Sequence, residues 1–270
     1  MAITALYSAA TGLKALSTRI DVIANNLANA ETTAFKAQRA NFEDLYYQEL
    51  KQPGTTDSSN VVSPAGIFVG LGTKLSNTQL DLTQGSMQAT GGNLDLGIQG
   101  NGYFAVKILP SLGKNGVGYT RNGSFTVNSA GQLVVNIGNG YQLIPPVNLP
   151  TNATNISVAQ DGTVQYVKAG ATAKTIGGQI KLAMFPNPEG VNILGGGLYT
   201  ESEASGPPVT SIPGENGTGQ IQAGFLESSN VDPVTELVTL IKTQRSFELN
   251  SQSIQTADQA LQVIGNMKKS

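Results

Sequence analysis

The 270-residue sequence contains no histidine, no cysteine and no tryptophan, and only 13% of its residues are charged. Without thiolate or imidazole side chains, the chain lacks the usual ligands of zinc, iron–sulfur, haem and copper sites. The same absences exclude Ser-His-Asp and Cys-His nucleophilic catalysis. Disulfides cannot form, so cysteine usage indicates no redox compartment. We expect no catalytic residue, no metal ligand and no cofactor, although the composition leaves open a carboxylate-only enzyme or an oxygen-ligated Ca²⁺ or Mg²⁺ site.

Positive charge is also scarce. Lys and Arg number 16 against 18 Asp and Glu, which gives a formal net charge of −2. Because no basic excess is available to neutralise phosphates, we expect no nucleic-acid partner. The glycine-rich stretches lack the phosphate-loop pattern and are typical of turns between strands, so we expect no nucleotide site. We also expect no small-molecule substrate. A surface this poor in charge is typical of one that other subunits cover.

Carboxylates are the one catalytic alternative that the composition leaves open. An enzyme that acts on a glycan would need two of them facing each other across a cleft. Solvated turn residues are the favoured interpretation, and the Asp161–Thr163 segment is typical of an Asx turn rather than a calcium loop. The candidates lie in the middle of the chain: Asp81, Asp95, Asp161, Glu189, Glu201 and Glu203.

The amino-terminal stretch does not resemble a cleavable signal. It has no basic start, and Lys14, Arg19 and Asp21 interrupt the apolar positions. No apolar run approaches the roughly 18 residues that a membrane helix needs. We expect a chain that stays in the cytosol or is exported without a cleaved signal peptide. A surface adhesin would need such a signal.

Both ends of the chain carry heptad patterns. The pattern over 3–30 predicts one helix, and the pattern that follows the Asp232–Pro233 cap predicts a second over 233–267. The first has apolar residues at Leu6, Ala9, Leu13, Leu16, Ile20, Ile23, Leu27 and Ala30. The second has Leu240, Thr243, Phe247, Asn250, Ile254, Ala257, Leu261 and Ile264. Because neither helix is stable alone in water, we expect them to pair.

Short β-type runs bounded by Gly and Asn turn signals fill the middle of the chain, and no helical pattern lies between them. Residues 200–219 are expected to form a surface loop. The predicted fold is α+β: paired terminal helices form a coiled-coil assembly domain, with an inserted, mainly antiparallel β domain and an extended arm. The predicted domains are 1–35 with 230–270 (helices), 36–75 with 221–229 (connecting arm) and 76–220 (β-rich outer domain).

Six sequence blocks together resemble one family, the rod and hook proteins of the bacterial flagellum. The blocks cover nearly the whole chain in the family's order: Leu6–Leu13, Ile23–Lys36, Asp95–Phe104, Tyr119–Phe125, Gly224–Asp232 and Gln244–Ser251. The resemblance is closest to the distal-rod branch, because the segment 46–75 looks like the extended insertion of that branch, a stretch that is shorter in hook protein. Ala34 and Phe247 stand where Gly and Tyr are common. Hook protein or another rod subunit is the alternative.

The resemblance implies a structural protein and not an enzyme. Subunits of the family stack into a hollow helical homopolymer, and the distal rod crosses the periplasm as a rigid drive shaft that passes torque to the hook. The implied partners are further copies of the chain, proximal rod proteins, hook protein, the surrounding L- and P-ring bushing proteins and the flagellar export apparatus. The implied location is the flagellar basal body.

The candidate site residues are therefore interface residues. Those expected at the assembly interface are Leu6, Leu13, Leu16, Ile20, Ile23, Leu27, Leu240, Phe247, Ile254, Leu261 and Ile264. Those that carry the family motif are Asn25, Asn26, Asn29, Gln244, Arg245 and Asn250, and the three first asparagines are expected to satisfy backbone groups where helix gives way to arm. Gln52, Pro53 and Gly54 are assigned to a rigidity arm within 46–75, which we expect to brace a subunit against its neighbour.

Overall fold

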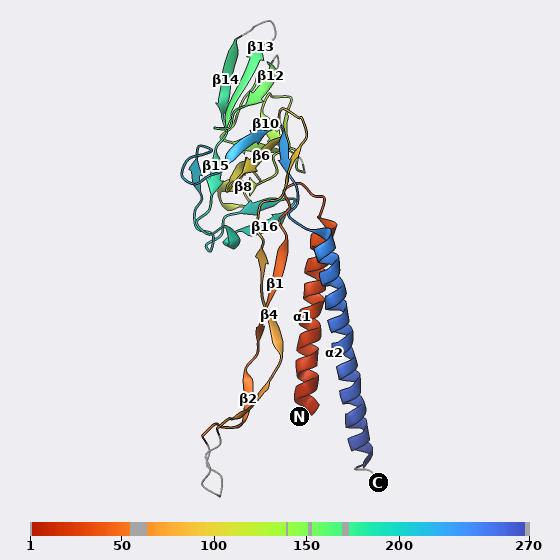
Figure 1. The fold of residues 1–270 in the computed structure, drawn as a ribbon. Coiled ribbons are helices and arrows are strands. Elements are labelled where there is room, and N and C mark those ends of the chain that lie inside the picture. The colour runs from red at the N-terminus through yellow and green to blue at the C-terminus, as the bar shows by residue number, and fades with distance from the viewer. Residues whose placement is uncertain (1, 55–63, 139, 151–152, 169–172, 268–270) are drawn as a thin grey trace. The chain divides into compact units, whose positions relative to one another are not determined.

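The computed structural model describes residues 2–54, 64–138, 140–150, 153–168 and 173–267 (Figure 1). The chain divides into two compact units. The helical unit comprises Met1–Ala28, Gln38–Leu80 and Asp232–Ser270, and the β unit comprises Asn29–Ala37 and Asp81–Val231. Each unit is therefore built from segments that are far apart in the sequence.

The helical unit contains the two terminal helices, α1 (Ala2–Ala28) and α2 (Pro233–Met267). Asp232 caps α2: its carboxylate accepts hydrogen bonds from the Val234 N–H (3.1 Å) and the Thr235 hydroxyl (2.6 Å). These two bonds lower the pKa of Asp232, with the Thr235 hydroxyl as the larger cause. A charged cap at this end also complements the helix dipole. The helices lie side by side in the unit.

A long two-stranded ribbon completes the helical unit. Its first half pairs β1 (Gln38–Asp44) with β4 (Thr73–Leu80), and its second half pairs β2 (Tyr47–Lys51) with β3 (Ile67–Gly70), all antiparallel. The first half packs against α1. Helix α1 therefore has two covered faces, one toward α2 and one toward the ribbon.

The β unit is built from short strands, and every pairing among its described strands is antiparallel. Its largest sheet has the order β16-β17-β8-β7-β11-β10-β9, with β15 joining β7 to β18. A three-stranded sheet has the order β12-β13-β14, and the pairs β19-β6 and β20-β5 complete the unit. Two 3-10 turns, Lys114–Gly116 and Pro188–Gly190, interrupt the connections.

The strands of the β unit have these bounds: β5 (Met87–Ala89), β6 (Leu96–Gln99), β7 (Tyr103–Lys107), β8 (Val117–Thr120), β9 (Phe125–Val127), β10 (Leu133–Val135), β11 (Tyr141–Ile144), β12 (Ala153–Val158), β13 (Thr163–Lys168), β14 (Lys174–Gln179), β15 (Leu182–Met184), β16 (Asn192–Gly195), β17 (Leu198–Thr200), β18 (Val209–Ser211), β19 (Gln220–Ala223) and β20 (Phe225–Glu227).

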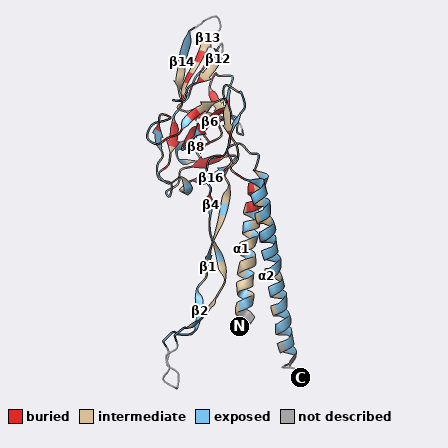
Figure 2. Cartoon of the chain, viewed as in Figure 1, coloured by how far each residue is buried: buried red, intermediate tan, exposed pale blue. Residues whose placement is uncertain are grey.

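The hydrophobic core belongs to the β unit. Its fully buried side chains include Leu96, Ile98, Phe104, Leu133, Leu143 and Leu182. Buried positions concentrate in this unit, whereas most of α2 is exposed (Figure 2). The β unit therefore has the core of an ordinary globular domain, while the helical unit leaves much of its apolar surface uncovered.

The predicted α+β class, with terminal helices and antiparallel strands between them, is confirmed. Contacts between α1 and α2 are consistent with pairing, but a coiled coil is not established and remains a proposal. The β1–β4 ribbon was not predicted, because residues 31–50 carry neither a clear helical nor a clear strand pattern. The expected loop over 200–219 is wrong at β18, which pairs with β15. None of the described helices is long and apolar enough to span a membrane.

Candidate assembly site

The heptad residues of both helices lie on the less exposed faces of the pair. Ile23 is buried, and the expected interface residues Leu6, Leu13, Leu16, Ile20, Leu27, Leu240, Ile254 and Leu261 are partly buried. Phe247 keeps 37% of its surface exposed. The side chain of Ile264 lies outside the described residues. Nothing in a single chain tests whether these residues meet a second copy, so their assembly role stays a prediction.

The two polar heptad positions on α2 are accommodated in different ways. Thr243 is buried, and its hydroxyl donates to the Thr239 carbonyl at 2.8 Å. Asn250 lies against Gly12 of α1, where an added Cβ would approach the Asn250 amide nitrogen to 3.1 Å. Gly12 thus makes room for a polar side chain between the helices, which is consistent with one fixed helix register.

The outer face of α2 exposes an apolar stripe near its start. Val234, Leu237, Val238 and Ile241 are 70%, 45%, 45% and 58% exposed. Their helical spacing places them on one face, because residues three, four and seven apart are neighbours on a helix. Leu249, at 63% exposure, continues the same face. We call the first four residues the helix stripe.

Asn26 joins three elements within the helical unit. Its amide donates to the Gln38 carbonyl (2.8 Å) and accepts from the Gln38 N–H (2.9 Å), as a neighbouring β-strand would. The same amide nitrogen donates to Glu236 Oε1 of α2 at 3.2 Å. Because Asn26 is 1% exposed, these bonds form where water does not compete. The end of α1 is therefore tied to the start of β1 and the start of α2.

A second polar contact ties the ribbon to the beginning of α1. The Ser8 hydroxyl donates to the Gly70 carbonyl at 3.2 Å, and the Thr11 hydroxyl accepts from the Thr73 N–H at 3.4 Å. Gly72 has a φ of +113°, and a Cβ there would collide with the Thr11 hydroxyl. Only glycine permits this close approach and this backbone conformation together. We call this contact the arm clasp.

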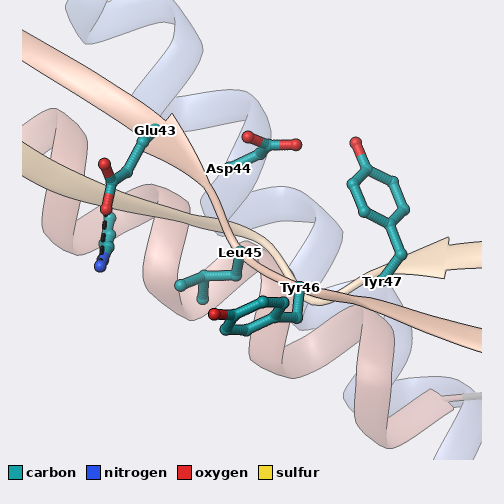
Figure 3. A pocket seen from close by; sticks show the side chains of 6 residues that line it. Glu43, Asp44, Leu45, Tyr46 and Tyr47 are labelled. Atoms are coloured by element: carbon teal, nitrogen blue, oxygen red, sulfur yellow. Dashed lines mark ion pairs between the residues drawn. The ribbon is translucent and has the colours of Figure 1, made fainter.

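The strands β2 and β3 expose a second apolar surface. Tyr46, Tyr47, Leu50, Ile67 and Phe68 are 90%, 57%, 53%, 53% and 52% exposed, and we call them the tip patch. Next to it, a recess of about 370 Å³ is lined by Tyr46, Tyr47, Leu45 and the charged residues Glu43, Asp44 and Lys74. In Figure 3, Asp44 and Tyr47 project to one side of the ribbon, and Leu45 and Tyr46 to the other. Apolar surface is therefore offered on both sides.

The assigned rigidity residues Gln52, Pro53 and Gly54 follow β2 and are exposed. The segment 55–63 lies outside the described residues. The contribution of this arm to stiffness therefore stays a prediction. Among the expected motif residues, Arg245 pairs with Glu248 at 2.9 Å on the exposed surface of α2, and Gln244 and Asn25 are exposed. Asn29 accepts a hydrogen bond from the Thr32 hydroxyl.

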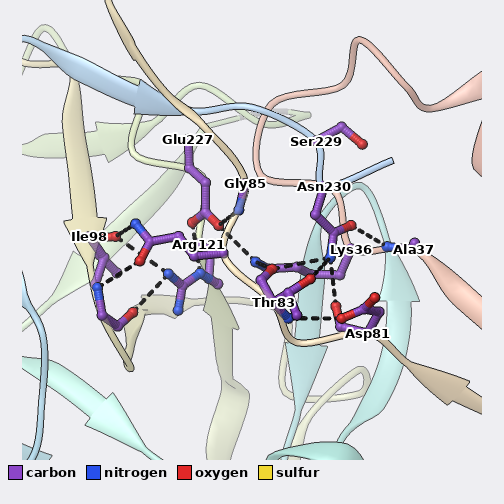
Figure 4. Close-up of polar contacts among 12 residues, drawn as sticks. Lys36, Ala37, Asp81, Thr83, Gly85, Ile98, Arg121, Glu227, Ser229 and Asn230 are labelled. Atoms are coloured by element: carbon purple, nitrogen blue, oxygen red, sulfur yellow. Dashed lines mark hydrogen bonds and ion pairs between the residues drawn. The ribbon is translucent and has the colours of Figure 1, made fainter. Parts of the chain in front are cut away.

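Within the β unit, three charged side chains form a buried ion triad (Figure 4). Lys36 Nζ lies 2.7 Å from Glu227 Oε1, and Arg121 Nε lies 2.8 Å from Glu227 Oε2. Lys36, Arg121 and Glu227 expose only 2%, 6% and 1% of their surfaces. Further bonds satisfy the remaining polar atoms: Lys36 donates to the Thr83 carbonyl and Arg121 to the Gly102 and Gly100 carbonyls. Sequence reasoning assigned no role to these residues.

Burial and charge oppose each other in the triad. Burial alone would raise the pKa of Glu227, but the charges of Arg121 and Lys36 outweigh it and hold this pKa below the ordinary value. Burial lowers the pKa of Lys36, and Glu227 offsets only part of that effect. The carboxylate also accepts the Gly85 N–H at 3.0 Å. Glu227 is thus held as a carboxylate that several donors share.

Beside the triad, the Asn230 side chain is hydrogen-bonded to two other segments of the β unit. Its Oδ1 accepts the Ala37 N–H at 2.7 Å, and its Nδ2 donates to the Asp81 and Thr83 carbonyls at 2.9 and 3.1 Å. The Ala34 N–H also donates to the Glu227 carbonyl at 2.8 Å. The segment after α1 and the segment before α2 are therefore both bonded into the β unit.

Three of the carboxylates considered for catalysis have structural partners in turns and on the surface. Asp161 accepts from the Thr163 N–H and hydroxyl, Glu201 pairs with Lys114 at 2.8 Å, and Asp95 accepts from the Thr90 hydroxyl. Within the described part of the chain, no cluster of three or more acidic side chains is placed to hold a metal ion.

Comparison with known proteins matches the chain along its length. Residues 6–36 match the family model described as flagella basal body rod protein. Residues 97–166 match the flagellar hook protein FlgE/F/G D1 domain, and 222–267 match the flagellar basal body rod FlgEFG protein C-terminal model. The flagellar basal-body rod protein FlgG of Buchnera aphidicola subsp. Acyrthosiphon pisum is 42% identical, over 98% of this chain and 100% of its own length.

The FlgG proteins of Caulobacter vibrioides and Borreliella burgdorferi are 41% and 40% identical, again over 98% of this chain and over 99% and 98% of their own lengths. The chain belongs to the flagellar basal-body rod protein family. The predicted resemblance is confirmed. Members of this family are structural, which agrees with the expectation that the chain is not an enzyme.

The ion triad joins three of the sequence blocks that carry the family resemblance. Lys36, Arg121 and Glu227 each lie in a different sequence block that carries the family resemblance. Asn26 and Asn230 lie in two of the same blocks. No local signal in the sequence identified these contacts, because the sequence does not show that the blocks meet.

Proposed function

We propose that the chain is a structural subunit of the distal part of the flagellar rod. In this role it polymerises into a rigid hollow helical shaft that transmits torque from the motor to the hook. The observation that carries the proposal is the uncovered helical unit, in which α2 and the tip patch expose large apolar side chains. Full-length similarity to rod proteins supports the same role. Exposed apolar surface of this extent is typical of an interaction site.

In this proposal, different parts of the chain have different roles in the rod. The terminal helices (1–35 with 230–270) form the assembly domain through the heptad residues, paired as a coiled coil. The region 76–220 forms the outer domain, and 36–75 with 221–229 connect the two. The rod lies in the periplasm, and the subunit reaches it through the flagellar export apparatus without signal cleavage. Its neighbours are proximal rod proteins, hook protein and the L- and P-ring bushing proteins.

A charge placed in the heptad seam tests the assembly role. Ile254 is partly buried on the α1 side of α2, whereas the adjacent Gln255 is exposed. Ile254→Asp should abolish polymerisation of the purified chain, measured by sedimentation and electron microscopy. The β unit should stay folded, because it does not contain Ile254. Gln255→Asp is the matched control and should polymerise. Normal assembly of Ile254→Asp would show that the seam is wrongly assigned.

The segment 46–75 separates the distal-rod proposal from the alternative of hook protein or another rod subunit. We propose that this arm braces each subunit against a neighbour and so suppresses bending. Deleting residues 55–66 should give flexible polymers, visible as curved particles in electron micrographs. A variant in which the same residues become a Gly/Ser segment of equal length separates loss of length from loss of side chains. Straight polymers after the deletion would contradict the bracing role.

A further inference from the structure

The helical unit carries two separate exposed apolar surfaces, the helix stripe on α2 and the tip patch on β2 and β3. Both are exposed by about half or more of each side chain, with Tyr46 at 90% and Val234 at 70%. A two-stranded ribbon such as β2-β3 is only marginally stable in water by itself, and its bond to α1 lies at one end, at Gly70. We therefore expect both surfaces to be buried against a partner molecule.

The two surfaces lie at opposite ends of the helical unit. Asn26, near the end of α1, bonds to Gln38 at the start of the ribbon and to Glu236 beside the helix stripe. Ser8 and Thr11, near the beginning of α1, bond to Gly70 at the end of β3 and to Thr73 at the start of β4. From Ser8 to Asn26 the helix rises about 27 Å. A chain's own tip patch therefore cannot cover its own helix stripe.

We propose that the tip patch of one subunit docks on the helix stripe of a second copy of this chain. The inference rests on the proposed function, because it names the surface of the neighbour that receives the arm. The stripe is Val234, Leu237, Val238 and Ile241, and its occupant is the ribbon segment that carries Tyr46, Tyr47, Leu50, Ile67 and Phe68.

Charges of opposite sign flank the two surfaces. Lys242 and Arg245 follow the helix stripe, where Arg245 also pairs with Glu248. Asp44 at the end of β1 and Glu49 on β2 flank the tip patch, and β2 ends at Lys51. All four flanking side chains are exposed, so a partner can reach them. Opposite charges around an apolar contact fix its register and disfavour contact of like patches.

The symmetry of the contact suits a polymer. Two different patches that meet head to tail form a heterologous interface, and repetition of such an interface gives an open helical filament. A stripe that paired with an identical stripe would instead close a two-fold dimer. Because the tip patch and the helix stripe lie at opposite ends of one unit, each added copy presents a fresh stripe and a fresh tip.

Cysteine cross-linking tests the contact directly, because the natural chain has no cysteine that could react in the background. The chain carrying both Leu50→Cys and Ile241→Cys should form a ladder of covalent multimers when its polymers are oxidised. A mixture of the two single variants should form covalent dimers only. Leu50→Cys combined with Ser246→Cys, which is exposed on another face of α2, is the matched control and should not form the ladder.

The outcomes separate this inference from the proposed function. Polymers of the double variant that give no ladder overturn the docking of tip on stripe and leave the rod role intact. Dimers from Ile241→Cys alone also overturn it, because they show stripe against stripe. A wild-type chain that does not polymerise under any assembly condition defeats the proposed function and the inference with it. As a second measurement, Ile241→Asp should raise the critical concentration for polymerisation at least tenfold, and Ser246→Asp should not. Equal critical concentrations for the two variants would also overturn the docking.

Discussion

Glu227 is the residue on which the β unit's polar interior depends. It is shared by Lys36 and Arg121, and all three side chains are almost fully buried. Bringing three charges out of water is costly, and their attraction compensates only when every partner is present. Their value is therefore best seen as specificity: three segments distant in sequence must arrive together for the charges to be balanced.

Replacing the shared carboxylate tests this dependence. Glu227→Gln leaves two buried cations without a counter-charge, so the free energy of unfolding should fall by about 3–5 kcal/mol. Glu248→Gln removes the carboxylate of an exposed pair with Arg245 and should change stability little, because exposed pairs contribute little. Urea denaturation followed by circular dichroism measures both. Equal stability of the two variants would contradict a structural role for the triad.

The same residue gives the β unit a defined response to acid. The pKa of Glu227 in the folded chain lies below the ordinary value of a glutamate, which is about 4.3. The Glu227 carboxylate therefore makes its full contribution to stability at pH values above that ordinary value. This contribution is lost as the pH falls from there through the folded pKa, since the unfolded chain then binds more protons. The stability difference between wild type and Glu227→Gln should therefore shrink on acidification. A difference that stays constant from pH 7 to pH 3 would show that Glu227 is not held ionised by its neighbours.

At the scale of elements, the ribbon's direction is set by two contacts on α1. Asn26 holds its start, and the arm clasp holds it where β3 meets β4. Between these two contacts, the β1–β4 half of the ribbon packs along one face of α1. The ribbon is thus fixed at both ends of its packed half, and β2 and β3 extend beyond the clasp.

A single added methyl group at Gly72 should disrupt the arm clasp. Gly72→Ala places a Cβ against the Thr11 hydroxyl at a positive φ, so the ribbon must move away from α1. Gly54→Ala is the matched control, because Gly54 also has a positive φ (+86°) but has open space around its Cβ position. Hydrogen exchange of β1 and β4 should accelerate in Gly72→Ala only. Equal acceleration in both variants would assign the effect to backbone strain and not to the clasp.

At the scale of the whole molecule, the chain is assembled from interleaved segments. The two segments of the β unit, Asn29–Ala37 and Asp81–Val231, are separated in the sequence by Gln38–Leu80, which belongs to the helical unit. The ion triad and Asn230 explain this division, because they bond residues 34–37 and 227–230 to the segment 81–121. The segment that follows α1 and the segment that precedes α2 are consequently part of the folded β unit.

Limited proteolysis of the purified monomer tests that division. We expect the terminal helices to be trimmed while peptides that contain Lys36 and Glu227 remain bound to the resistant β unit, because both are buried in it. Mass spectrometry of the resistant material identifies them. In polymers the helices should be protected as well. A resistant core that ends near residue 220 and lacks both peptides would refute the inclusion of these segments.

Much of the architecture could be read from local pattern. The two heptad runs predicted α1 and α2, and the Asp232–Pro233 cap placed the start of the second helix at the observed residue. Glycine- and asparagine-bounded apolar runs predicted antiparallel strands such as β6 and β7. Local pattern failed for β1 and β4, because their polar outer faces and small residues give a weak alternation. Their pairing through Phe42 and Leu75 is stabilised by α1, which is a tertiary effect.

By itself, the sequence determined that the chain has no thiol or imidazole group, and it predicted the two terminal helices and the family. These depend on residue type and on short-range periodicity, which act along the chain. Only the tertiary structure decided that Lys36, Arg121 and Glu227 meet, that Gly72 lies against Thr11, and that α2 and the ribbon tip leave apolar surface uncovered. Contacts between residues nearly two hundred positions apart have no local signature. They follow from which surfaces remain available once the helices and strands have packed.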